Sequence, residues 1–222
     1  MPTISNRAVG GTGLLAIFCD LAEPDKTDFR PWLAEEMFPA RVAIGFRACA
    51  SFDRVSGEGP EFATLYETSS PGDLYGRPYQ RLRENRSQRD LAYHQKFQNP
   101  ERHTLTWVGP ELTATASSTA SLAASMFSEY IHVDRFELPS ADIQPFNMWF
   151  VNTYLPGLTE LRGFARVRRY LSLEGKPAHF VLHEFADMSF EDDPAWRNLR
   201  ENFIKSQSGL YRRIVHAPPE PA

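Results

Sequence analysis

The pattern of hydrophobic and polar residues predicts strands and helices in a repeated order. The first apolar run, Gly13 to Leu21, is short and bounded by turn-forming residues, which is typical of a strand buried on both faces. A helix is expected next, because Thr27 and Asp28 are good N-caps and apolar residues then follow one helical face. We expect Pro39 to end this helix.

The same pattern extends to a complete unit of four strands and two helices. Two strands, a helix and a closing strand are expected at residues 44–52, 61–68, 74–85 and 103–108. Residues 86–101 are polar and rich in Gln and Arg, and the second half has no segment of matching length. We interpret them as an inserted loop or short helix. The order β-α-β-β-α-β is the ferredoxin-like pattern.

The second half of the chain repeats the first at a separation of 117 residues. Residues 60–67 (PEFATLYE) align with residues 177–185 (PAHFVLHEF) at Pro, Leu and Glu, and His183 falls where Tyr66 stands. The LREN tetrapeptide at residues 82–85 recurs at 199–202. We therefore interpret the chain as a duplicated unit, with a first ferredoxin-like unit at 13–112, a linker at 113–126 and a second unit at 127–217.

Two such units have a preferred way to associate. A four-stranded sheet with helices on one face leaves its other face bare. Tandem copies can cover each other's bare faces, so the predicted fold class is α+β, with two ferredoxin-like units closing a barrel-like arrangement within one chain. The helix faces stay free in this arrangement, which is compatible with a homodimer.

Several residues of this skeleton resemble a known superfamily. They are Phe29, Trp32, Pro39, Gly45-Phe46, Leu65-Tyr66-Glu67, Tyr79 and Leu82, with counterparts Phe146, Trp149, Pro156, Gly163-Phe164, Leu182-His183-Glu184, Trp196 and Leu199. The pattern resembles the dimeric α/β-barrel superfamily, particularly its EthD-like branch. The resemblance implies a small-molecule protein, since members include cofactor-free monooxygenases, polyketide cyclases, lactone isomerases, dehydratases and haem enzymes.

The chain departs from the EthD-like pattern at one position. Such sequences often carry a His two residues before the proline of the first helix, where Met37 and Tyr154 stand here. Neither the chemistry of that His nor metal binding by it carries over to this chain.

Composition excludes some classes of function. The formal net charge is −4 and the pI is about 5.9, which disfavours a nucleic-acid binder. The apolar run Leu14 to Cys19 is too short to span a bilayer, and no secretory signal is visible. With only Cys19 and Cys49, no disulfide framework is expected. We expect a cytoplasmic protein that contacts no membrane.

Three histidines of the second half carry the predicted chemistry. His183 lies on the presumed central strand, where an imidazole could act as general acid or base, or be a half-buried residue bonded to a neighbouring carbonyl or Tyr. His132 is expected on the adjacent strand and could share its pocket. His179 and His183 share a strand face about 13 Å apart, so they are not expected to chelate one metal, and no metal site is predicted.

The predicted site is a pocket in the second half of the chain. Its catalytic candidates are His183, His132 and Tyr66, and its lining candidates are Trp149, Phe150, Tyr154, Trp196 and His179. Aromatic residues at helical spacing are also ordinary core residues, but a cavity lined by them would suit an aromatic or hydrophobic ligand.

Three hypotheses about function follow. The first is a cofactor-independent lyase or isomerase that transfers protons on an aromatic, lactone or polyketide-like small molecule. The second is a haem-binding protein of the same superfamily. The third is a non-catalytic protein that binds a small molecule in the same pocket.

Overall fold

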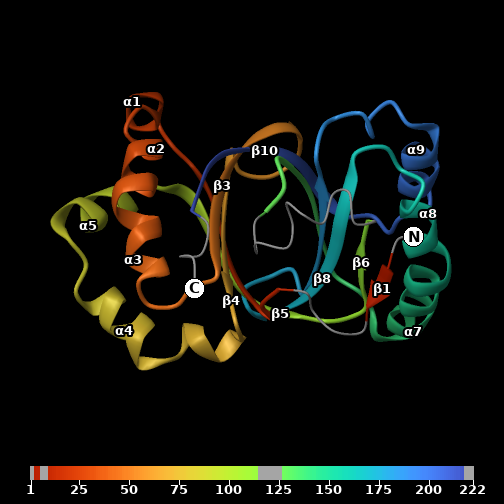
Figure 1. Cartoon of the computed structure of the whole chain (residues 1–222), viewed down its shortest axis with the longest axis horizontal. Coiled ribbons are helices and arrows are strands. Elements are labelled where there is room, and N and C mark those ends of the chain that lie inside the picture. Colours follow the sequence, from red (N-terminus) through yellow and green to blue (C-terminus); the bar gives the residue numbers. More distant parts are fainter. Residues whose placement is uncertain (1–2, 6–9, 115–126, 218–222) are drawn as a thin grey trace.

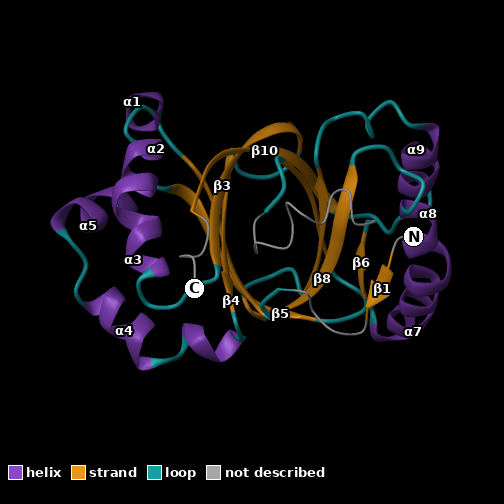
Figure 2. Cartoon of the chain, viewed as in Figure 1, coloured by secondary structure: helices purple, strands orange, loops and turns teal. Residues whose placement is uncertain are grey.

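A closed antiparallel barrel lies at the centre of the molecule. The computed structural model describes residues 3–5, 10–114 and 127–217. In these residues ten strands form one sheet in the order β1-β6-β8-β5-β2-β4-β3-β10-β7-β9, and a further pairing of β8 with β9 closes the ring. Helices cover the barrel on two opposite sides, and Figures 1 and 2 show the barrel between them.

The first half supplies one helical layer and four barrel strands. Its elements are β2 (Gly13–Asp20), α1 (Glu23–Lys26), α2 (Phe29–Trp32), the π-helical turn η1 (Leu33–Met37), α3 (Phe38–Val42), β3 (Ala48–Gly57), β4 (Phe62–Thr68), the 3₁₀ turn η2 (Pro71–Leu74), α4 (Arg77–Glu84), α5 (Gln88–His94) and β5 (Gln98–Trp107). These strands lie in the order β5-β2-β4-β3. This is the ferredoxin-like arrangement.

The second half has the same topology. Its elements are β7 (Tyr130–Phe136), α7 (Ser140–Trp149), the π-helical turn η3 (Phe150–Tyr154), α8 (Leu155–Leu158), β8 (Phe164–Glu174), β9 (His179–Phe185), α9 (Pro194–Glu201) and β10 (Gln207–Ala217). The strand order is β10-β7-β9-β8. Pairings of β5 with β8 and of β3 with β10 join the two sheets. The fold class expected from the sequence is confirmed.

Some local expectations need correction. Pro39 does not end the first helix but stands at the start of α3, which continues to Val42. The π-helical turn before it widens the backbone, which accommodates the missing N–H of proline. The segment 86–101 does contain a short helix, α5, one of the two alternatives expected there, but it also contains the beginning of β5, which starts at Gln98 and not at His103. At the predicted linker, Thr113 belongs to β6 (Glu111–Thr113), which pairs with β8 and with β1 (Thr3–Ser5), and residues 115–126 lie outside the described part.

An ion network inside the barrel connects the halves. Arg168 of β8 donates to Glu67 of β4 at 2.7 Å and to Glu184 of β9 at 2.9 Å, and all three residues are buried. Arg166 donates to Glu184 as well, at 2.9 Å. Because a buried carboxylate is stable only when it is paired, this network favours the closed barrel.

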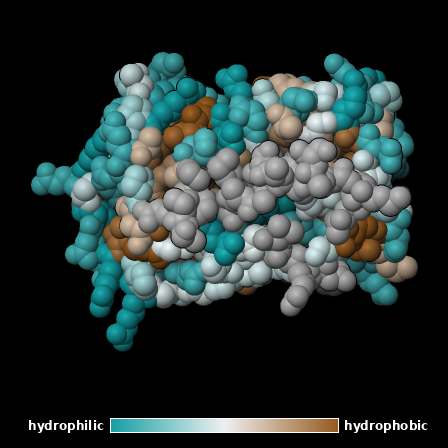
Figure 3. All heavy atoms as spheres, in the orientation of Figure 1, coloured by the Kyte–Doolittle hydropathy of each residue, from teal (hydrophilic) through white to brown (hydrophobic). Residues whose placement is uncertain are grey.

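The outer surface is mostly polar. The face seen in Figure 3 is largely hydrophilic, with separate hydrophobic patches. No helix in the described part of the chain combines the length and hydrophobicity needed to cross a bilayer.

Candidate functional site

Each half has a chamber between its sheet and its helices, and the strand registers define equivalent positions in the two chambers. Leu15 of β2 lies opposite Tyr66 of β4, and His132 of β7 lies opposite His183 of β9. Both pairs are related by the same separation of 117 residues that the sequence shows. The chambers can therefore be compared residue by residue.

His183 is enclosed in the second chamber. Its Nε2 lies 2.8 Å from the hydroxyl of Tyr154, and its Nδ1 lies 3.2 Å from the backbone oxygen of His132. The imidazole is therefore a neutral ring that donates from Nδ1 and accepts at Nε2. Burial, with an exposed fraction of 0%, lowers the pKa of His183 to about 3. The residue is thus occupied at both nitrogens and closed to solvent.

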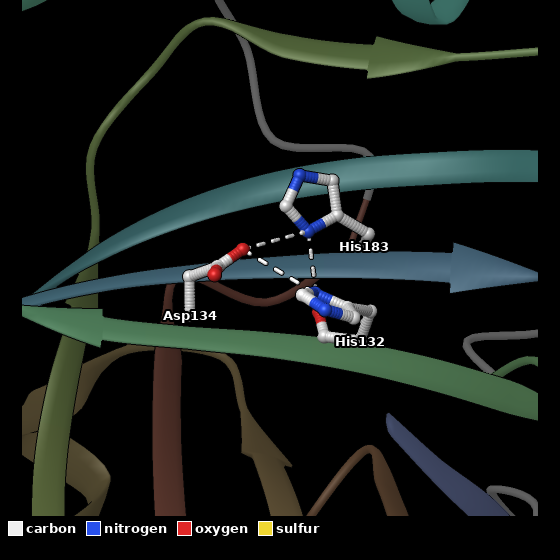
Figure 4. A group of neighbouring side chains, drawn as sticks. All are labelled: His132, Asp134 and His183. Atoms are coloured by element: carbon white, nitrogen blue, oxygen red, sulfur yellow. Dashed lines mark hydrogen bonds and ion pairs between the residues drawn. The ribbon is translucent and has the colours of Figure 1, made fainter. Parts of the chain in front are cut away.

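Asp134 completes a cluster with the two histidines, shown in Figure 4. Arg200 of α9 holds both carboxylate oxygens, at 2.8 and 2.6 Å, and His132 Nδ1 lies 3.3 Å away. Burial alone would raise the pKa of Asp134, but His132, Arg200 and His183 together hold it well below its usual range. Asp134 is therefore an ionised carboxylate with a fixed partner.

The cluster has side chains of the kinds that bind metals, but its carboxylate is already paired with an arginine. Ligand atoms of His132, Asp134 and His183 all lie within 4.8 Å of one another. However, a divalent cation would have to share Asp134 with the Arg200 guanidinium, and would displace His183 from Tyr154 or from His132. The donor set fits a hydrogen-bonded core better than a metal.

Aromatic rings fill the rest of the second chamber. The ring of Phe203 lies 5.1 Å from that of Tyr154 and 5.8 Å from that of Trp149. Phe150 stacks on Tyr154 at 5.4 Å, and Trp196 of α9 lies edge-on to His183 at 5.5 Å. The residues predicted to line a pocket therefore pack against one another as core.

His179 does not join the His183 group. It lies at the start of β9 and stacks on Phe136, with ring centroids 5.4 Å apart. Trp196 borders a shallow surface hollow with Arg197 and Arg200. His183 thus lies buried among these rings with both nitrogens hydrogen-bonded, and no cavity borders it among those that the described residues form.

The first chamber contains a cavity. Its volume is about 280 Å³, just below the roughly 300–1,000 Å³ typical of small-molecule sites. Strand residues Leu15, Ile17 and Tyr66 line one wall. Phe29, Trp32 and Met37 line the helical wall. Of the predicted catalytic residues, Tyr66 is the one that borders this space.

Three replacements explain why one chamber is open and the other is filled. Phe150, Tyr154 and Phe203 of the second half correspond to Leu33, Met37 and Arg86 of the first half, each at a separation of 117 residues. Leu33, Met37 and Arg86 line the cavity. The side chains of Leu33, Met37 and Arg86 leave the first chamber partly open. In the second chamber three aromatic rings fill the equivalent space.

His94 lies at the cavity wall with one ring nitrogen free. Its Nδ1 lies 2.8 Å from the backbone oxygen of Asp90 and 3.0 Å from the Asp90 carboxylate. Because both neighbours are acceptors, Nδ1 carries the proton, and in the neutral form of the ring Nε2 holds a lone pair. Nε2 has no hydrogen-bond partner among the residues that the structure describes. This is the arrangement of an oriented general base.

Asp90 is suited to hold that histidine. Burial by itself would raise the pKa of Asp90, but the hydrogen bond with His94 and the charges of His94, Arg41 and Arg86 lower it. Both residues come from α5, whose N-cap Ser87 accepts a hydrogen bond from the Asp90 backbone. The His94 ring meets the edge of Trp32 at 5.7 Å and Phe97 at 5.2 Å.

Two further polar groups border the cavity. Tyr66 is buried, and burial raises the pKa of its phenol, so it stays protonated and can donate. Arg41 of α3 is 5% exposed and lies over the Tyr66 ring at 5.0 Å. The cavity thus combines aromatic walls with a base, a phenol and a guanidinium.

The sequence analysis did not identify Arg41, Asp90 or His94. A signal for two of them is present, because Asp90 and His94 stand at a spacing of four within the segment that the second half lacks. That spacing places two side chains on one helical face. Arg41 follows Pro39, where a helix was not expected to continue.

Comparison with known proteins identifies the fold. No family model matches this chain, and no curated protein matches it by sequence. The solved structure of an anthrone oxidase-like protein matches with a TM-score of 0.61 and 11% identity, over 100% of this chain and 98% of the other. A candidate monooxygenase from Lactobacillus acidophilus matches with a TM-score of 0.57 and 13% identity, over 94% and 97%.

A third match extends the range of proteins with this fold. A candidate chlorite dismutase has a TM-score of 0.51 and 11% identity, over 92% of this chain and 96% of its own. At such identities the likeness concerns the fold and not the reaction. On topology and on these matches, this chain has the dimeric α/β-barrel fold, built from two ferredoxin-like units in a single polypeptide.

Proposed function

We propose that the cavity of the first half binds an aromatic small molecule and that the protein transfers protons on it, with His94 as the base. The observation that carries this proposal is the His94–Asp90 pair at the wall of an aromatic cavity. One imidazole nitrogen is fixed by a carboxylate and the other is free. This is the geometry that general-base catalysis requires.

The proposed step removes a proton from a carbon that is linked to a carbonyl group directly or through an aromatic ring. The proton moves to His94 Nε2, and the electron pair of the C–H bond passes to the carbonyl oxygen as an enolate. Asp90 stabilises the imidazolium that forms. Tyr66 can donate to the enolate oxygen, because its phenol stays protonated. The proton then returns to another atom in an isomerase, or a leaving group departs in a lyase.

The substrate class follows from the walls. Phe29, Trp32 and Tyr66 present aromatic surface to the cavity, and such surface favours a flat aromatic, lactone or polyketide-like molecule. An enolate that is conjugated with an aromatic ring forms more readily than an isolated one. The proposed chemistry and the proposed ligand are therefore consistent.

Oxygenation is the second candidate function. Two of the matched structures are named for monooxygenase or anthrone oxidase-like proteins. The same first step would serve here: the carbanion adds dioxygen, takes a proton to give a hydroperoxide, and loses water to leave a ketone. Residues His94, Asp90 and Tyr66 would have the same roles until dioxygen adds.

Haem fits this cavity poorly. His94 could offer Nε2 as an axial ligand, and its Asp90 partner is of the kind that supports such ligands. However, a porphyrin is larger than most drug-sized ligands, and the cavity of about 280 Å³ is below the range that those require. We therefore derive no step through haem. An absorption spectrum after haem addition tests this alternative, since a Soret band of bound haem would support it.

The test of the proposed function uses anthrone as a probe, because its methylene protons are acidic and lie opposite a carbonyl group. Loss of methylene protons to deuterated water, measured by NMR, reports proton transfer, and an oxygen electrode reports oxygenation. His94→Gln should lower the exchange rate by about 10²- to 10⁴-fold. His183→Gln is the matched control and should leave the exchange rate of the folded protein unchanged.

Three outcomes separate the hypotheses. Exchange without oxygen uptake supports an isomerase or lyase, and exchange with uptake supports an oxygenase. Full exchange activity in His94→Gln, or its loss in folded His183→Gln, would contradict the proposal. Binding of anthrone without any exchange would favour a non-catalytic binding protein.

A further inference from the structure

We infer that the ligand of this cavity carries an oxyanion, a carboxylate or an enolate or phenolate oxygen, which binds Arg41. This inference rests on the proposed small-molecule site and adds the charge of its ligand. It depends on three hydrogen-bond donors that border the same space, and on the charges around the entrance.

Arg41 is a buried cation that has no acidic partner within the part of the chain that the structure describes. Its Nη1 donates to the backbone oxygen of Met37 at 3.1 Å and to the Met37 sulfur at 3.2 Å. Its Nε has no partner, although it is buried. No carboxylate among the described residues lies within ion-pair distance of Arg41. Asp90 is close enough for its pKa to be lowered by the Arg41 charge, but it is committed to His94.

Two other donors border the cavity without an acceptor. The indole Nε1 of Trp32 is buried and has no hydrogen-bond partner. The hydroxyl of Tyr66 has none within the described part of the chain. A buried donor without a partner costs about 1–3 kcal/mol. The two buried donors and the Tyr66 hydroxyl belong to residues that line one cavity, and a ligand atom that accepts several hydrogen bonds, as an anionic oxygen does, satisfies them best.

Other buried arginines show what a structural arginine looks like in this fold. Arg166 and Arg168 are each paired with Glu184, and Arg135 is paired with Glu101. Arg169 resembles Arg41 in having no acidic partner, but its guanidinium lies over the rings of Phe146 and Phe150 at 5.4 Å each. Arg41 differs from all four because it lines a cavity large enough for a ligand.

Further positively charged residues line the same cavity as Arg41. Arg83, Arg86 and Arg102 line the cavity with Arg41. Glu101 also lines it, but that carboxylate is already paired with Arg135. Arg86 is paired with Asp90, and Arg102 with Glu174. Arg83 lies over the Tyr79 ring at 6.0 Å. Arg86 and Arg102 are thus paired, as Glu101 is, so within the described residues Arg41 and Arg83 are the cations of this lining without an acidic partner, and they favour an anionic ligand.

The test compares two probes of the same shape. 2-Naphthoate carries a carboxylate, and 2-naphthamide is its neutral counterpart. By isothermal titration calorimetry, the wild-type protein should bind 2-naphthoate on the order of tenfold more tightly or better, because a charge-assisted hydrogen bond is stronger than a neutral one. Arg41→Met should abolish the preference, and Arg169→Met, the matched control, should keep it.

Several results would overturn the inference. They are equal binding of the two probes by the wild type, no binding of either, or a preference that survives in Arg41→Met. If Arg41→Met does not fold, Arg41→Lys replaces it in the test. Lysine keeps the positive charge but lacks the planar guanidinium group that can donate two parallel hydrogen bonds. It should weaken the preference, and an unchanged preference would count against the inference.

A kinetic comparison identifies the source of the anion. If the substrate arrives as a carboxylate, Arg41→Met should raise KM. If the charge develops during proton removal, the same variant should lower kcat in the anthrone assay with KM unchanged. The proposed function can fail independently: normal exchange in His94→Gln would refute the base while the preference for naphthoate stands. Loss of that preference with His94 still essential would refute only this inference.

Discussion

Two histidines of this chain show how surroundings decide what a residue can do. His183 has both nitrogens bonded and is fully buried, whereas His94 has one nitrogen fixed by Asp90 and the other free at a cavity. The sequence favours His183, because it stands on a central strand beside His132. The register does place these histidines opposite each other. Residue type and strand position could be predicted, but the packing that closes the site could not.

The enclosed state of His183 has a consequence for acid stability. Its pKa is about 3 in the folded protein and about 6.5 in an unfolded chain. Between these values the unfolded state binds a proton that the folded state does not, so stability is complete above pH 6.5 and falls as the pH is lowered. The slope is about 1.4 kcal/mol per pH unit.

The comparison that checks this is urea unfolding of the wild type and His183→Gln at pH 7 and pH 5. The wild type should lose about 2 kcal/mol more than the variant over this interval, since the other titrating groups are common to both proteins. An equal loss in the two proteins would show that His183 is not a buried neutral group.

At the scale of elements, the site depends on what fills each chamber and on one inserted helix. The periodic pattern predicts the order of the strands and helices, because apolar spacing follows from burial, but not all of their bounds: the strand expected at 44–52 is β3, Ala48–Gly57. It does not reveal that Phe203 occupies the second chamber while Arg86 stands at the equivalent entrance of the first. It leaves residues 86–101 open between an inserted loop and a short helix, and does not single out Asp90 and His94, which α5 carries there.

Filling the first chamber should abolish ligand binding. Met37→Tyr places at the cavity wall the residue that the second half has at the equivalent position, Tyr154. The added ring should occupy the space of the ligand and weaken 2-naphthoate binding by about tenfold or more, because overpacking leaves no room for both. Calorimetry measures the affinity, and circular dichroism confirms that the variant is folded.

The control for this substitution is Met148→Tyr, the same change at an exposed position of α7 in the second half. Its affinity for 2-naphthoate should equal that of the wild type. Unchanged binding by folded Met37→Tyr would mean that the ligand occupies another place.

At the scale of the whole molecule, two units of one topology form a single barrel and differ in role. The ion network joins them, because Arg168 of the second half bridges Glu184 of its own half and Glu67 of the first half. The recurrence of residues at a separation of 117 predicts this pairing of units, because sheets with a bare face must be covered. Which unit holds the site depends on the volume left between its sheet and its helices. That volume cannot be read from the amino-acid composition.

The central claim is that the ligand binds in the first half of the chain. A crystal structure of the protein with 2-naphthoate tests it most directly. The account predicts the naphthalene ring between Trp32 and Tyr66, with the carboxylate on Arg41 and one ring edge facing His94. A naphthoate bound beside His183 in the second half, or an empty first chamber in a crystal that holds the probe elsewhere, would contradict it.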